Sequence, residues 1–407
     1  MAGGDRVEPQ ITEWVALVVR WMHLVFGAAW IGASFYFNWL NNHVRKPEAG
    51  RPGVAGDLWA IHGGHFYEVA KYENAPERLP DTLHWFKWEA YFTWFTGLGL
   101  LVLVYYLQAS TFMVDRGVMD LTPAAAVGVG VGTLVAGWIV YDLLCRSPLG
   151  RTGAPFAAIG FALASAVAWA LFQVLGARAA YIHVGAMLGT LMALNVFFVI
   201  IPNQRKAVAA MVAGEVPDPR LGQGAAQRSL HNNYMTLPVL FIMISNHYPF
   251  TYGHEQGWLI LVALGAIGGV VRHWFNLKGQ GVRKDWLLPL AAAGLVLLVV
   301  AAAPRRSAWA DTPVPFSRVR AILEERCQKC HSATPTWPGI LTAPQGVVYD
   351  TVADITRYAP RINAQVSTGV MPLGNVTGMT DEERDIVTAW FAQGAKTVDP
   401  APAAAAP

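Results

Sequence analysis

Charged side chains and cysteines are scarce in this chain. Only 14% of its 407 residues are charged, the formal net charge is +3, and there are three cysteines. A net charge this small, without a basic stripe interleaved with aromatic residues, argues against a nucleic-acid partner. Three cysteines cannot build a disulfide framework. A disordered chain is excluded as well, because 54% of the residues are hydrophobic and 16 are tryptophan.

Long apolar runs fill residues 1–303. A helix needs roughly 20 apolar residues to cross a bilayer, and about eight stretches of this chain meet that need. They are Trp14–Leu40, Phe86–Leu107, Ala124–Cys145, Ala154–Gly176, Ala179–Ile201, Tyr234–Pro249, Gly257–Phe275 and Trp286–Ala303. Pro238 interrupts the sixth. Because residues 1–10 are polar and the first run is too long for a signal peptide, we interpret that run as a retained span. The predicted fold is an all-α membrane bundle.

The basic residues between these runs predict the orientation of the bundle. Lys and Arg accumulate in connections on the cytoplasmic side of a membrane. Here they gather after the first, third, fifth and seventh predicted spans, and the first of these connections holds Arg45, Lys46, Arg51, Lys71 and Arg78. The other connections hold few. We therefore expect both termini on the periplasmic side of a bacterial inner membrane.

The composition changes after the last apolar run. A proline-rich linker, 304–314, leads to a polar segment, 315–396, and then to a tail of alanine and proline, 397–407, for which we expect disorder. The polar segment is predicted to be a separate soluble domain. Helices are expected over Phe316–Gln328 and Asp381–Phe391, the second opened by a capping box of Thr380 and Glu383.

The polar segment carries the strongest chemical signal. Cys327-Gln328-Lys329-Cys330-His331 has the spacing for covalent haem c, in which two thiols add to the vinyl groups and the histidine ligates iron. Met371, beside Pro372, is the expected second axial ligand, with Met379 as the alternative. A zinc site or redox CxxC lacks a second ligand pair. The prediction is one haem c in a small class I cytochrome c domain, attached outside the cytoplasm, in agreement with the expected orientation.

Histidines within the apolar runs are candidates for a second haem. Ionisable residues inside a membrane are rare and often functional, and two imidazoles facing each other across a helix bundle suit haem b. His23 and His183 are the first candidates, with His84, His231 and His273 as alternatives. The competing interpretation is that each histidine hydrogen-bonds a neighbouring helix.

The runs that hold these two histidines also resemble each other. When His23 is set beside His183, Phe37 falls on Phe197 and Arg45 on Arg205. This match predicts two related halves of four helices each, as a parallel repeat.

The connection Asn41–Trp85 is long enough to suggest a function. It contains His62-Gly63-Gly64-His65, which predicts a short hairpin. Polar residues of this connection and of the start of the next run, Phe86–Leu107, could bind and deprotonate a small polar substrate, because they include bases and a cation. These residues are His62, His65, Tyr67, Lys71, His84 and Glu89. The alternative is a solvated loop at the membrane surface.

Three segments together resemble the family of membrane-bound urate hydroxylases. They are Trp59–Gly64, Trp85–Tyr91 and Asn195–Gln204, followed by the terminal haem c motif, so that the resemblance covers essentially the whole chain. It implies an oxidoreductase of purine catabolism that converts urate to 5-hydroxyisourate with water as the oxygen source. Electrons would leave through haem to the fused cytochrome c, and then to a soluble or membrane cytochrome c and a terminal oxidase.

The alternative function is a respiratory electron-transfer subunit, coupled to quinol or cytochrome, without a purine site. The urate-binding residues, the number of membrane haems and the presence of a homo-oligomer stay open from the sequence.

Overall fold

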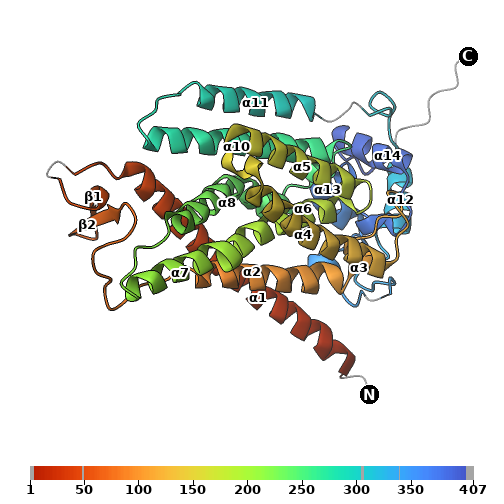
Figure 1. Cartoon of the computed structure of the whole chain (residues 1–407). Helices are drawn as coiled ribbons and strands as arrows, with labels where there is room; N and C mark the ends of the chain where they lie inside the picture. The colour runs from red at the N-terminus through yellow and green to blue at the C-terminus, as the bar shows by residue number, and fades with distance from the viewer. Residues whose placement is uncertain (1–3, 48–49, 304–306, 339, 400–407) are drawn as a thin grey trace, which may run out of the picture.

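The structure is a computed structural model that describes residues 4–47, 50–303, 307–338 and 340–399. Long helices form a bundle, with a β-hairpin at one end and a small helical domain at the other (Figure 1). We call these the hairpin end and the C-terminal end. The first helix begins at the C-terminal end, so the start of the described chain and the small domain lie on the same side of the bundle (Figure 1).

Nine longer helices form the described part of the bundle. They are α1 (Gly4–His43), α2 (Trp88–Leu100), α4 (Pro123–Arg146), α5 (Ala154–Phe172), α6 (Ala177–Leu194), α7 (Ile201–Val212), α8 (Pro219–Ser245), α10 (Gly257–Gly279) and α11 (Leu287–Ala301). Two π-helical segments extend them: η1 (Leu101–Tyr106) continues α2, and η3 (Asn195–Ile200) joins α6 to α7. The short helices α3 (Ala109–Phe112) and α9 (Pro249–Tyr252) and the 3₁₀ turn η2 (Pro148–Arg151) lie in the connections.

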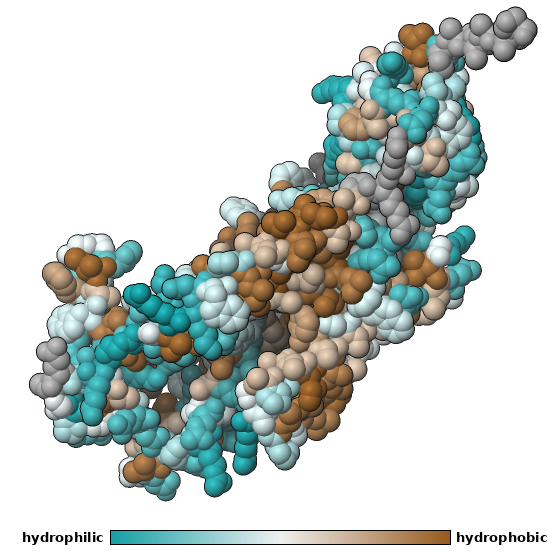
Figure 2. Space-filling model, turned by 90° about the horizontal axis from the view of Figure 1, so that it is seen from above, coloured by the Kyte–Doolittle hydropathy of each residue, from teal (hydrophilic) through white to brown (hydrophobic). Residues whose placement is uncertain are grey.

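Five helical stretches in the described residues are long and apolar enough to cross a membrane. They are Ile11–His43, Pro123–Arg146, Ala154–Phe172, Ala177–Val212 and Gly257–Gly279, which confirms five of the predicted runs as candidate spans. Figure 2 shows apolar residues gathered over the middle of the molecule and hydrophilic residues toward its ends. The other three predicted runs are helical but do not meet both criteria, and α11 has only 15 residues. The count of eight spans therefore stays a prediction.

Helix α8 begins much earlier than the sixth apolar run predicted. The run starts at Tyr234, whereas the helix starts at Pro219, where the side chain of Asp218 accepts a hydrogen bond from the backbone N–H of Arg220 at 2.9 Å. Hydropathy misses this first half because it is polar. Arg228, Asn232 and Asn233 are nevertheless buried between helices, and Pro238 lies inside the helix without ending it.

The predicted hairpin is confirmed. Strands β1 (Val54–His62) and β2 (His65–Tyr72) pair antiparallel, with His62 opposite His65. The turn between them needs a positive φ at both positions, and Gly63 and Gly64 supply 60° and 82°.

The C-terminal domain has its own core, separate from that of the bundle. Its helices are α12 (Phe316–Arg326), α13 (Val352–Val366) and α14 (Asp381–Ala392), with 3₁₀ turns η4 (Pro344–Gly346) and η5 (Leu373–Asn375). Val319, Leu323, Ile355 and Trp390 are almost fully buried in that core. The predicted helices here are confirmed, as is the capping box at the start of α14. Residues 304–306 of the predicted linker and 400–407 of the predicted tail lie outside the described residues.

Candidate functional site

A buried arginine on α8 starts a polar network between α4, α6 and α8. Arg228 is only 4% exposed. Its Nη2 donates to Oδ1 of Asp142 at 2.7 Å, and its Nη1 donates to Oδ1 of Asn195 at 3.1 Å. Arg146 also pairs with Asp142 at 2.7 Å. The charge of Arg228 is thus neutralised inside the bundle.

The network continues to a histidine. Nδ2 of Asn195 donates to the Tyr141 hydroxyl at 2.9 Å and to Oδ1 of Asn232 at 2.8 Å. The Tyr141 hydroxyl lies 2.9 Å from Nδ1 of His231, and because this oxygen accepts from Asn195, its own proton is available to Nδ1. Asn195 is the first residue of a π-helical segment, a feature frequent at functional sites. The cluster offers a neutral imidazole held by a phenol.

A second buried arginine contacts the opposite side of α8. Nε of Arg272 on α10 donates to Oδ1 of Asn233 at 2.8 Å, and Nδ2 of Asn276 donates to the same oxygen at 3.0 Å. The guanidinium carbon lies 4.4 Å from the centre of the Phe35 ring on α1. Nδ2 of Asn233 is buried without a hydrogen-bond partner. One residue further along each helix, the Tyr234 hydroxyl lies 2.7 Å from Nδ1 of His273.

The two histidines predicted for haem b contact different helices. Nδ1 of His183 donates to the Ala179 carbonyl at 2.8 Å, and its buried Nε2 has no partner. That nitrogen faces Gly130 on α4 so closely that a Cβ there would lie 2.5 Å away. Nδ1 of His23 lies 3.0 Å from the Thr93 carbonyl on α2. The free Nε2 of His183 suits a metal ligand, and it lies against the backbone of Gly130.

The predicted substrate-binding residues lie at or near the hairpin. His62 and His65 flank its two-glycine turn, and Tyr67 is 49% exposed on β2. Lys71 donates to the side chain of Asn41 at the end of α1. His84 packs edge-on against the Phe86 ring, and Glu89 lies in the first turn of α2. The structure thus spreads these side chains over an exposed surface at one end of the bundle.

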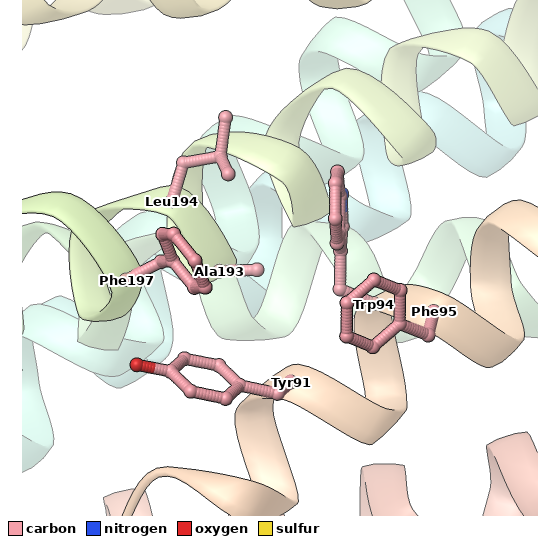
Figure 3. Close-up of a pocket in the computed structure, with 6 residues that line it drawn as sticks. All are labelled: Tyr91, Trp94, Phe95, Ala193, Leu194 and Phe197. Carbon is pink, nitrogen blue, oxygen red and sulfur yellow. The ribbon is translucent and has the colours of Figure 1, made fainter.

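A crevice between α2 and α6 is too small for a substrate. Its lining comes from Tyr91, Trp94 and Phe95 of α2 facing Ala193, Leu194 and Phe197 (Figure 3). Its volume of about 10 Å³ is that of one water molecule at most.

The residues of the haem c motif fit covalent attachment. Neither Cys327 nor Cys330 is in a disulfide. Nδ1 of His331 donates to the Val347 carbonyl at 3.0 Å, which leaves Nε2 as the free ring nitrogen. Burial raises the pKa of the Cys327 thiol to about 12 and also raises that of Cys330, whereas a redox CxxC depends on a lowered pKa.

The rival interpretations of this motif find less support. Within the described ranges, no three His, Cys, Asp or Glu side chains are grouped to hold a metal ion, as a zinc site would need. Met379 is 2% exposed in the domain core, whereas Met371 is half-buried on a loop. This arrangement favours Met371 as the axial ligand, which stays a prediction.

The loop that carries Met371 packs against the bundle. Val370 contacts the bundle core, and η5, which follows Met371, contacts α3. Two glycines allow this close approach. A Cβ on Gly374 would lie 2.6 Å from the Val114 carbonyl oxygen, and a Cβ on Gly253 would collide with the Thr368 carbonyl oxygen. The expected iron-binding face of the domain therefore lies toward the bundle.

Sequence reasoning missed most of the buried polar side chains. The apolar runs and their histidines gave no site role to Arg228, Arg272, Asn195, Asn232 or Asn233. The available signal was polarity within or beside an apolar run, as in Arg228–Asn233 and Arg272-His273. Hydropathy alone does not tell which of these residues meet one another.

Comparison with known proteins covers the bundle. A family model described as urate oxidase N-terminal matches residues 9–303. No curated protein and no solved structure matches the chain. The matched range contains the hairpin and both arginine clusters, and it ends before the C-terminal domain.

Proposed function

This chain belongs to the urate oxidase N-terminal family, and from that membership we propose that it oxidises urate to 5-hydroxyisourate. Water supplies the hydroxyl oxygen, so that urate and water yield 5-hydroxyisourate, two protons and two electrons. The electrons pass to a haem c in the C-terminal domain, and from there to a soluble or membrane cytochrome c and a terminal oxidase. The enzyme resides in a bacterial inner membrane with both termini in the periplasm.

The observation that carries this proposal is the contact between the Met371 loop and the bundle. An electron acceptor in the C-terminal domain can take electrons from the matched region, residues 9–303, only if the two lie close together. The contacts of Val370 with the bundle core and of Gly374 with the Val114 carbonyl support a short path from the bundle to this domain.

The residues of the C-terminal domain have separate tasks in this proposal. Cys327 and Cys330 would hold haem c through thioether bonds, Nε2 of His331 and the sulfur of Met371 would be its iron ligands, and the Val347 carbonyl orients the imidazole. Bound haem supplies a one-electron acceptor. Haem b at His23 and His183 stays a prediction, and no step here depends on it.

Proton removal from water or urate needs a neutral base. Nδ1 of His231, which accepts from the Tyr141 hydroxyl, is such a base inside the bundle, and a proton would reach it through the phenol. The hairpin residues His62, His65 and Lys71, with His84 and Glu89, are the alternative set at the surface.

The test is reduction of haem c by urate in purified membranes. We expect the reduced α-band to appear on addition of urate without dioxygen, with two haems reduced per urate consumed. Cys327→Ala with Cys330→Ala should abolish the band while the bundle still assembles. Reduction by dithionite or quinol but not by urate would overturn the proposal in favour of a respiratory subunit.

A further inference from the structure

The environment of Arg272 differs from that of an ordinary structural arginine. The residue as a whole is only 9% exposed. Within the part of the chain that the structure describes, no carboxylate lies within 4 Å of its nitrogens, and its one hydrogen bond runs from Nε to Asn233. Among the described residues the two Nη groups have no hydrogen-bond partner, and unlike Nδ2 of Asn233 they are not fully enclosed.

A buried cation without a counter-ion is costly. Transfer of an isolated charge out of water is unfavourable unless the charge is paired and hydrogen-bonded. The Phe35 ring, 4.4 Å away, offsets only part of that cost. An anion that enters from outside would complete the pairing.

The neighbouring amide adds a second unused donor. Oδ1 of Asn233 accepts from both Arg272 and Asn276, so turning the amide over would lose two hydrogen bonds. The assigned orientation leaves Nδ2 buried with no acceptor. Arg272 and Asn233 thus each keep N–H groups without a hydrogen-bond partner among the described residues.

We propose that Arg272, Asn233 and Phe35 form the site that binds the urate anion inside the bundle. The identity of the anion rests on the function proposed above. Urate is a flat monoanion at neutral pH with carbonyl oxygens and ring nitrogens as acceptors. A guanidinium fork and an amide N–H match such acceptors, and the Phe35 ring offers a flat surface to a purine.

The helix that supplies Phe35 also offers a way in. In the most apolar stretch of α1 only 6% of the residues are buried. In the most apolar stretch of the continuous helix Ala177–Val212, formed by α6, η3 and α7, 56% are buried. α1 packs more extensively on α2 than on α10, and moving it away from α10 would uncover the guanidinium beside Phe35. Urate enters beside α1 and is then closed in by Phe35.

The experiment measures urate binding to the purified full chain by equilibrium dialysis with radiolabelled urate. Arg272→Gln should weaken binding about 10- to 100-fold, the value of a charged hydrogen-bonded contact. The matched control is Arg283→Gln, an exposed arginine after α10, which should bind as the natural chain does. Hypoxanthine, a neutral purine, should bind weakly to all three proteins.

A second variant guards against loss of fold. Asn233→Asp supplies Arg272 with a built-in carboxylate, so it should raise the unfolding midpoint while weakening urate binding. Arg272→Met should leave the midpoint unchanged or raised, because it removes an unpaired buried charge. A lowered midpoint in Arg272→Met with unchanged urate affinity in Asn233→Asp would assign Arg272 a structural role and overturn the proposal.

The two proposals fail in different ways. If urate reduces haem c and Arg272→Gln binds urate as tightly as the natural chain, the Arg272 site is wrong and the function stands. If the natural chain neither binds urate nor is reduced by it, the function is wrong and the site falls with it.

Discussion

Two buried arginines lie on or against α8, and they differ in their partners. Arg228 has a carboxylate, Asp142, at 2.7 Å, whereas Arg272 has only an amide and an aromatic ring. Both residues are buried, at 4% and 9% exposed. The difference teaches that burial of a charge alone does not reveal its task. A compensated guanidinium ties helices together, and an uncompensated one is free to bind a ligand.

The largest effect should come from removing the carboxylate partner of Arg228, which leaves it as unpaired as Arg272. Asp142→Asn leaves Arg228 buried and unpaired, which should lower the free energy of unfolding by about 3 kcal/mol. Urea unfolding in detergent micelles measures it. The control is Asp120→Asn, because Asp120 and its partner Arg116 are more than 80% exposed and should contribute less than about 0.5 kcal/mol. Equal effects of the two variants would contradict the buried pairing.

The next effect sharpens the comparison by removing both charges. Arg228→Met added to Asp142→Asn should recover part of the loss, with a coupling energy of about 2 kcal/mol in a double-mutant cycle. The same unfolding measurement serves. Strict additivity would mean that the two side chains do not stabilise each other.

A smaller effect is expected at the neutral end of the network. His231→Phe keeps the stacking on Phe156, whose ring centre lies 4.5 Å away, but removes the partner of the Tyr141 hydroxyl. The free energy of unfolding should fall by about 1 kcal/mol. Tyr141→Phe should cost a similar amount, and the two changes together should cost less than their sum.

The smallest effect belongs to an ion pair outside the bundle. Burial raises the pKa of the Glu383 carboxyl, but hydrogen bonds from Arg326 and at the helix cap lower it more, so its pKa lies below the ordinary value. The stability from this pair is therefore fully present above the ordinary pKa of glutamate and is lost as the pH falls through the lowered one. Glu383→Gln should cost about 0.5 kcal/mol at neutral pH and nothing in strong acid.

Hydrogen exchange of the α14 backbone amides checks that pH dependence. The natural chain and the variant are compared at each pH, so that the intrinsic exchange rate cancels. A difference in protection that stays constant down to strong acid would show that Glu383 acts without its charge.

Local patterns in the sequence predicted much of the fold. Five spans, the hairpin at Gly63-Gly64 and the capping box at Thr380 each depend on residues close together in the chain, so their physics can be read directly. The polar half of α8 was missed because hydropathy scores Arg228 and Asn233 as solvent-exposed. Their burial depends on Asp142 and Arg272, which lie far away in the sequence.

The candidate site was less predictable than the fold, for the same reason. His231 was named as a metal ligand, but its contact with Tyr141 follows only from the packing of α4 on α8. The approach of the Met371 loop to Val114 likewise depends on two glycines in different domains, which no local pattern connects.

The order of the polar contacts has a consequence for how the chain is made. A segment as polar as the first half of α8 does not enter a lipid phase unaided. Its partners Asp142 and Asn195 precede it in the chain, and Asn233 precedes Arg272 in turn. Arg228 and Arg272 thus leave the ribosome after these partners have been synthesised. The earlier helices then supply the polar partners that α8 needs when it packs into the bundle. A chain translated without α4 should leave Arg228 unpaired and be degraded faster than the natural chain.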